Sequence, residues 1–220
     1  MSTHYARGVD GQARRERLAH SRLYLILEAR PHGEDPRPLL TAALRGGVDV
    51  VQLREKELGA EALLDSAEKF RAVCEEHGAL FVLNDRPGLV AECGADGVHV
   101  GRSDMPAARA RSLVGPERLI GLSASTLDEL EEVGGADYVG VTAFATPTKE
   151  DAVPGGLELL GAAAETLTVP WFAIGGIELS NVAEVVGAGA PGIAVVRAIR
   201  DADDPEAAAR ALRTSLDRKQ

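Results

Sequence analysis

Short apolar runs alternate with longer segments of helical spacing along most of the chain. A short apolar run followed by a polar turn is typical of a buried parallel strand. Runs of this kind predict strands at 23–27, 48–54, 80–83, 97–100, 119–122, 138–141, 171–174 and 193–196. Apolar residues at helical spacing, with Pro36 near one start and Gly46 and Gly78 at two ends, favour helices between the strands. These are expected at 36–45, 60–77, 106–113, 127–133, 157–167, 181–186 and 205–216, with a short helix ending at Cys93.

Eight strand–helix units in sequence predict an α/β protein with a single (β/α)8 TIM barrel over residues 21–220. Residues 1–20 lack an apolar period and are expected to be a polar, loosely attached N-terminal tail. A doubly wound open sheet is the alternative. It would need a glycine-rich phosphate fingerprint after the first strand, and residues 27–31 offer none.

Charge and composition exclude several classes of partner. The net charge is −10 over 220 residues and the pI is about 5.0, without the basic stripe of a nucleic-acid-binding protein. The sequence shows no signal peptide and no long apolar span, so a cytoplasmic protein without membrane contact is expected. Cys74 and Cys93 lack metal-ligand spacing and are expected to be buried free thiols. The oligomeric state is left open, with a homo-oligomer as one option.

The second predicted strand ends in side chains that suit an anion. Gln52, Arg54 and Lys56 occupy alternate positions and would share one face of an extended chain. Arginine and lysine at a buried strand end favour a phosphate ligand. The alternative is a strand end that frays into solvent, with Glu55 neutralising its neighbours.

Two carboxylates follow the third and fourth predicted strands. Asp85 and Asp104 would lie at adjacent strand ends, where paired oxygen ligands suit Mg²⁺ bound to phosphate oxygens. The structural alternatives are a turn residue for Asp85 and a helix N-cap for Asp104. The pair beside Arg54 and Lys56 favours a metal–diphosphate site.

A second anion site is indicated at the later strands. Gly175 and Gly176 follow the seventh predicted strand and could expose backbone N–H groups to phosphate. The loop 142–156 contains Thr146, Thr148 and Lys149, a set suited to an anion, although a plain surface loop is the alternative. His99 is expected to be a packed histidine. Two anion sites imply two phosphorylated small-molecule substrates, or one substrate with two phosphate ends.

The sequence resembles the thiamine phosphate synthase family from about residue 23 to the last predicted helix. The resemblance is carried, in this order and spacing, by QLREK at 52–56, NDR at 84–86, GVHVG at 97–101 with Asp104 and Pro106, TPTK at 146–149, AIGGI at 173–177 and VVRAI at 195–199. It implies a transferase that joins 4-amino-5-hydroxymethyl-2-methylpyrimidine diphosphate to 4-methyl-5-(2-phosphooxyethyl)thiazole, releasing diphosphate by a Mg²⁺-assisted dissociative substitution.

The resemblance also implies residue roles. Arg54, Lys56, Lys149 and Ser123 would be catalytic, and Asp85 and Asp104 would hold Mg²⁺. The pyrimidine diphosphate would contact Gln52, Leu53, Arg54, Glu55, Lys56, Asn84, Ser123 and Lys149. The thiazole phosphate would contact Thr146, Pro147, Thr148, Gly176, Val196 and Arg197.

The chain departs from the family pattern at three places. Ser123-Ala124-Ser125 replaces the common Ser-Thr-His, Arg102 replaces Gln, and Arg197 replaces the Ser of many members. Two alternatives share the barrel: a thiazole tautomerase-like paralogue and a non-catalytic sensor of phosphate ligands. Ser125, at the place where the tautomerase family uses a histidine, and Asp104, which that family lacks, favour the synthase. Asp85, Asp104 and Lys149 disfavour the sensor, which needs no leaving-group machinery.

Overall fold

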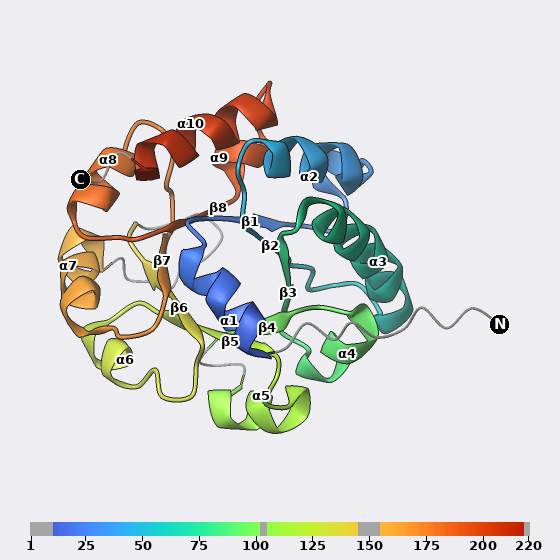
Figure 1. Ribbon diagram of the computed structural model, residues 1–220, viewed down its shortest axis with the longest axis horizontal. Helices are drawn as coiled ribbons and strands as arrows, with labels where there is room; N and C mark the ends of the chain where they lie inside the picture. Colours follow the sequence, from blue (N-terminus) through green and yellow to red (C-terminus); the bar gives the residue numbers. More distant parts are fainter. Residues whose placement is uncertain (1–10, 102–104, 145–154, 218–220) are drawn as a thin grey trace.

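The strands close into a parallel barrel in chain order (Figure 1). The computed structural model describes residues 11–101, 105–144 and 155–217. The last strand pairs with the first through Leu23 opposite Ile193. The (β/α)8 prediction is confirmed by the strands β1 (Leu23–Leu27), β2 (Val50–Leu53), β3 (Leu80–Asn84), β4 (Gly97–Val100), β5 (Leu119–Ala124), β6 (Tyr138–Thr142), β7 (Trp171–Ile174) and β8 (Ile193–Val195).

Most helices surround this barrel on its outer side, and one lies across its end (Figure 1). Residues 197–200 form a short helix that the sequence analysis did not predict, because four residues are too few to show a helical period. The helices are α1 (Gly11–His20), α2 (Pro36–Arg45), α3 (Ala60–His77), α4 (Val90–Cys93), α5 (Ala107–Val114), α6 (Leu127–Glu131), α7 (Gly156–Thr166), α8 (Val182–Gly187), α9 (Arg197–Arg200) and α10 (Pro205–Asp217), with 3₁₀ turns η1 (Pro31–Gly33) and η2 (Pro87–Leu89). Among the described helices, none is long and apolar enough to cross a membrane.

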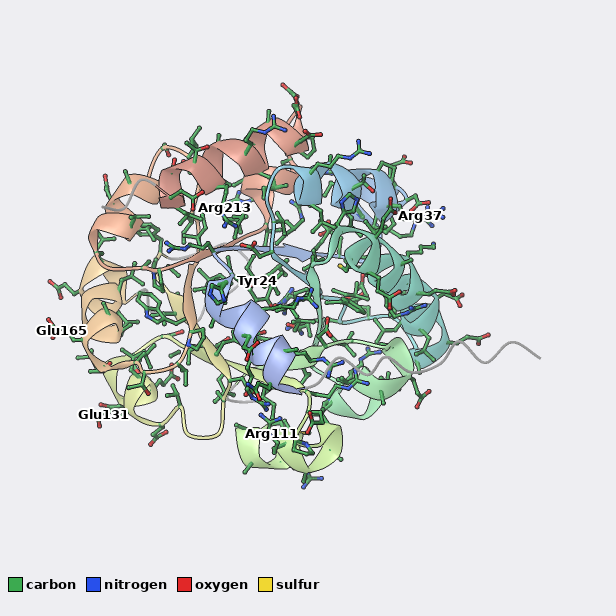
Figure 2. All side chains as sticks on the ribbon, viewed as in Figure 1. Tyr24, Arg37, Arg111, Glu131, Glu165 and Arg213 are labelled. Atoms are coloured by element: carbon green, nitrogen blue, oxygen red, sulfur yellow. The ribbon has the colours of Figure 1, made fainter. Side chains whose placement is uncertain are left out.

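Two separate cores follow from the alternation of side chains along the strands. One set of apolar side chains fills the layer between the strands and the helices. Cys74 and Cys93 lie in this layer as buried free thiols, as expected. The other set fills the barrel itself and includes Tyr24, Tyr138 and Phe172. Figure 2 shows Tyr24 near the middle of the barrel, while charged side chains such as Glu165 project outward from the helices. The barrel is therefore a packed core with chemistry confined to its ends.

Gly121 makes room for polar rings inside the barrel. A β-carbon at this position would lie 2.2 Å from Cζ of Tyr138 and 2.6 Å from Nδ1 of His99. Both distances are far below van der Waals contact, so any larger residue would displace one of the rings. The glycine thus permits an imidazole and a phenol to meet in the barrel centre.

Residues 11–20 form a helix packed against the amino-terminal end of the barrel, so the expectation of a loosely attached tail was wrong for them. Leu18 is fully buried in the inner core, next to Tyr24. Nε of Arg14 donates to Oδ1 of Asp96 at 2.8 Å, and Nε of Arg15 donates to Oδ1 of Asp137 at 2.7 Å. Ion pairs and one buried side chain, Leu18, hold the helix in place, which explains why its sequence shows no apolar stripe.

Three aspartates connect the amino-terminal ends of neighbouring strands through hydrogen bonds. Asp49, Asp96 and Asp137 each directly precede an even-numbered strand, β2, β4 or β6. Their carboxylates accept backbone N–H groups of the preceding strand at 2.7–3.0 Å. Each also pairs with at least one arginine. A carboxylate with several charge-assisted donors stabilises the end of the barrel opposite the strand carboxyl ends.

We expect Asp137→Ala to lower the free energy of unfolding by about 2–4 kcal/mol, because it removes the carboxylate partner of two arginines and the acceptor of a strand N–H. Asp137 is about 10% exposed and contacts Arg15, Arg111 and Ile120 N. Urea denaturation followed by circular dichroism measures the change. Asp65→Ala, which removes an exposed carboxylate of α3, is the matched control and should shift stability by less than about 0.5 kcal/mol. Equal effects of the two substitutions would contradict the connecting role of Asp137.

Candidate active site

One large cavity opens at the carboxyl ends of the strands. Its volume is about 820 Å³, within the range of small-molecule sites. Residues that follow β1, β2, β3, β4, β7 and β8 line it, together with side chains that rise from the barrel interior. The predicted site residues among its lining are Gln52, Arg54, Glu55, Lys56, Asn84, Asp85, Ser123, Gly176, Val196 and Arg197.

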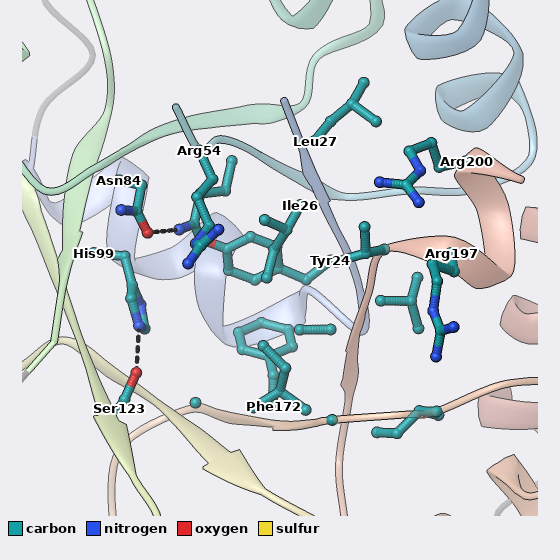
Figure 3. A pocket seen from close by; sticks show the side chains of 18 of the residues that line it. Tyr24, Ile26, Leu27, Arg54, Asn84, His99, Ser123, Phe172, Arg197 and Arg200 are labelled. Carbon is teal, nitrogen blue, oxygen red and sulfur yellow. Dashed lines mark hydrogen bonds between the residues drawn. The ribbon is translucent and has the colours of Figure 1, made fainter. Parts of the chain in front are cut away.

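Gln52, Arg54 and Lys56 all line this cavity, although β2 ends at Leu53. Gln52 is buried, and Arg54 is half-buried with its guanidinium directed into the cavity (Figure 3). Across residues 11–101, 105–144 and 155–217, neither Arg54 nor Lys56 has a carboxylate partner. In a protein of net charge −10, two cations left without ion pairs beside a cavity favour an anionic ligand.

Asn84 and Asp85 form the next part of the wall. Nε2 of Gln52 donates to Oδ1 of Asn84 at 2.6 Å, and Nδ2 of Asn84 donates to Oδ2 of Asp85 at 2.6 Å. Asp85 has φ +55° and Arg86 has φ +49°, two consecutive left-handed residues that are not glycine. Such backbone is costly and is concentrated at functional sites. This turn holds a carboxylate beside Arg54 and Lys56 in one cavity.

The opposite wall is built from the ends of β7 and β8. Gly175 has φ +106°, and a β-carbon there would lie 2.4 Å from the carbonyl oxygen of Phe144. Arg200 is paired with Glu28 at 3.1 Å and with Asp201 at 2.6 Å. Arg197, in contrast, is exposed and forms no close ion pair in the described part of the chain, although its charge helps to lower the pKa of Asp201. Figure 3 shows Arg54 and Asn84 on one side of the Tyr24 and Phe172 rings, and Arg197 and Arg200 on the other.

Some of the predicted residues do not take part in the described cavity wall. Leu53 is fully buried in the outer core between strands and helices, so its side chain faces away from the cavity. Asp104, Thr146, Pro147, Thr148 and Lys149 lie outside the described residues. The described wall therefore joins part of the predicted diphosphate site to part of the predicted thiazole phosphate site.

The sequence analysis missed polar residues at the floor of the cavity. His99, expected to be only packed, lies 3.0 Å through Nε2 from Oγ of Ser123 and 3.3 Å through Nδ1 from the hydroxyl of Tyr138. The hydroxyl of Tyr24 donates to Oε1 of Gln52 at 2.8 Å. Strand alternation is the signal that could have found them, because Tyr24, His99 and Tyr138 occupy inward positions.

The chain is similar to known proteins in both sequence and structure. The sequence model of the family described as "Thiamine monophosphate synthase" matches residues 23–199. A protein of Gloeobacter violaceus named "Thiamine-phosphate synthase" is 50% identical over 194 residues, which are 87% of this chain and 56% of that protein. The chain thus spans between half and two-thirds of that relative's length.

Two further relatives are matched over nearly their whole length. The "Thiamine-phosphate synthase" of Moorella thermoacetica is 44% identical over 201 residues, or 89% of this chain and 96% of that protein. The solved structure of a thiamine phosphate pyrophosphorylase from Pyrococcus furiosus has a TM-score of 0.82 and 35% identity, covering 92% of this chain and 97% of that chain. The chain belongs to the thiamine monophosphate synthase family.

Proposed function

We propose that this protein joins 4-amino-5-hydroxymethyl-2-methylpyrimidine diphosphate to 4-methyl-5-(2-phosphooxyethyl)thiazole and releases thiamine phosphate and diphosphate. The observation that supports the proposal is a single cavity lined at two places by cations that form no ion pair with a carboxylate among the described residues. Arg54, Lys56 and Asp85 come from the ends of β2 and β3, Gly176 and Arg197 come from the ends of β7 and β8, and all five line this cavity. Two substrates with phosphate groups at opposite ends would bring their reacting atoms together between these places.

The proposed reaction requires the side chains only to stabilise charge and to position the substrates. Diphosphate leaves from the pyrimidine methylene carbon, the C–O electrons go with it, and the thiazole nitrogen then donates its lone pair to the resulting cation. Arg54 and Lys56, with Lys149 from the predicted set, would stabilise charge that grows on the departing oxygen. Gly176 and Arg197, with Thr146, Pro147 and Thr148, would hold the thiazole phosphate. The mechanism needs no nucleophilic side chain.

A divalent cation fits the donor set at the diphosphate end. Asp85 offers a carboxylate in the cavity beside two cations, which is the hard oxygen chemistry that Mg²⁺ prefers, and Asp104 is the predicted second ligand. When bound there, Mg²⁺ would neutralise charge on the leaving diphosphate. Asn84 would orient Asp85 through their 2.6 Å hydrogen bond.

The cellular setting is part of the proposal. Buried free thiols at Cys74 and Cys93 suit a reducing compartment, and we propose a cytoplasmic enzyme that acts on small molecules.

The test is to mix the full chain with both substrates and Mg²⁺, with and without EDTA, and to measure thiamine phosphate. We expect product that disappears with EDTA and returns with added Mg²⁺. Absence of product with retained binding of the thiazole phosphate would overturn the proposal in favour of the tautomerase-like or sensor alternatives. Against the tautomerase, the hydroxyl of Ser125 lies 2.9 Å from that of Thr142 and supplies no base at that position.

A further inference from the structure

Seven polar side chains form one continuous hydrogen-bonded chain across the barrel floor. The successive distances are 2.6, 2.6, 2.8, 2.9, 3.3 and 3.0 Å. The chain begins at the carboxylate expected to hold the metal and ends at a hydroxyl on the cavity wall. We name it the floor chain, and its members in order are Asp85, Asn84, Gln52, Tyr24, Tyr138, His99 and Ser123.

The two phenols in the middle keep their protons. Burial, followed by the charge and hydrogen bond of Tyr138, raises the pKa of Tyr24 well above its ordinary value. Burial also raises the pKa of Tyr138, partly offset by the hydrogen bond to Tyr24. Each phenol therefore has one proton and donates one hydrogen bond.

The direction of every bond follows from the carboxylate end. Asn84 donates through Nδ2 to Oδ2 of Asp85 and accepts through Oδ1 from Nε2 of Gln52. Gln52 then presents Oε1 to Tyr24 and takes that phenol's only proton.

The same logic continues to the other end. The single hydroxyl proton of Tyr24 is used in the hydrogen bond to Gln52. Tyr138 must therefore donate its own hydroxyl proton to the oxygen of Tyr24. With that proton used, Tyr138 can only accept from His99, whose Nδ1 must therefore carry hydrogen. A neutral imidazole has one N–H, which leaves Nε2 as an acceptor for the hydroxyl of Ser123.

We propose that the floor chain holds His99 as the Nδ1–H tautomer, so that Ser123 donates inward and turns its oxygen lone pairs toward the cavity as a hydrogen-bond acceptor. Tyr24, Tyr138 and His99 are then positioning residues that act through Ser123. Resting on the proposed function, the group this acceptor selects is the exocyclic amine of the aminopyrimidine. Accepting from that amine also increases electron donation into the ring as the methylene cation forms.

The tautomer can be read without any substrate. Long-range ¹H–¹⁵N correlation spectra of the ¹⁵N-labelled full chain distinguish the two neutral forms, and His99→Gln identifies the signals of this ring among the five histidines. We expect the wild-type ring to be the Nδ1–H form. Finding the Nε2–H form, or a ring protonated on both nitrogens, would overturn the proposal.

Tyr24→Phe tests the direction of the hydrogen bonds at a residue that does not contact His99. The Tyr24 hydroxyl is hydrogen-bonded to Tyr138, which in turn is hydrogen-bonded to His99. Without its acceptor, Tyr138 should turn its proton to Nδ1 of His99 and shift the ring to the Nε2–H form. Ser125→Ala, which removes a hydroxyl at the end of the same strand as Ser123 but outside the floor chain, should leave the tautomer unchanged. A Tyr24→Phe ring that stays in the Nδ1–H form would also overturn the proposal.

Substrate selection gives a second readout. The pyrimidine diphosphate with an oxo group in place of the amine presents an acceptor where the site expects a donor. The ratio of kcat/KM for the amino over the oxo substrate should fall at least about tenfold in Tyr24→Phe relative to wild type. The comparison between enzymes cancels the substrates' different intrinsic reactivity, and an unchanged ratio would overturn the role of Ser123. If wild type forms no product, the proposed function fails while the spectra still decide the tautomer.

Discussion

Arg54→Ala should lower kcat for thiamine phosphate formation by about 10²–10³-fold, the usual effect of removing one preorganised donor to developing negative charge. The Arg54 guanidinium lies at the end of β2, directed into the cavity and without a carboxylate partner among the described residues. In the proposed reaction, Arg54 donates to the leaving diphosphate, and this hydrogen bond strengthens as the C–O bond breaks. KM for the thiazole phosphate, which we propose binds at the other wall, should change less than about threefold.

Two further variants make this result specific to Arg54. Arg54→Lys keeps the charge but not the planar fork, so it should recover only part of the activity. Arg45→Ala removes an exposed arginine of α2 and should leave kcat unchanged. Steady-state assays with each substrate varied in turn separate the effects. A loss confined to KM for the thiazole phosphate would move Arg54 to the other end of the cavity.

The barrel could be predicted from the sequence because each strand is marked by a short apolar run in its own stretch of the chain. The runs at Leu23–Leu27 and Gly97–Val100 are bounded by polar residues or glycine, and the structure starts and ends them where the sequence analysis does. Parallel pairing in chain order then leaves few topologies. Helix α1 had no such signal, because its stability comes from Asp96 and Asp137, which lie far away along the chain.

The site could be predicted only in part, for a related reason. Gln52 and Arg54 stand at one strand end, so alternation alone brings them to one cavity. The floor of the cavity depends on which inward residues meet across the barrel. His99 faces Ser123 and Tyr138 only because Gly121 leaves space between them. These contacts depend on residues of three different strands, so no single stretch of sequence predicts them.

Loss of either proposed metal ligand should have an effect of similar size to the loss of Arg54. Asp85→Ala and Asp104→Ala should each lower turnover more than about 100-fold at fixed Mg²⁺, because the leaving diphosphate would lack its neutralising cation. Asp85 stands in a left-handed turn with φ +55° and is oriented by Asn84, so the wild-type fold already carries a backbone cost to place this carboxylate. Steady-state rates at several Mg²⁺ concentrations measure the effect, and unfolding curves confirm that each variant is folded.

Metal binding itself separates a ligand from a residue that only supports the site. Titration calorimetry with Mg²⁺ and inorganic diphosphate should show weaker metal binding in Asp85→Asn, which keeps the shape of the side chain but removes its charge. Asp65→Asn, an exposed carboxylate of α3 outside the cavity, is the control and should bind as wild type does. A carboxylate contributes to Mg²⁺ affinity mainly through its charge, so the amide cannot replace it. Near-normal turnover of Asp104→Ala, or unchanged Mg²⁺ affinity of Asp85→Asn, would contradict the metal assignment and leave Arg54, Lys56 and Lys149 to stabilise the leaving group.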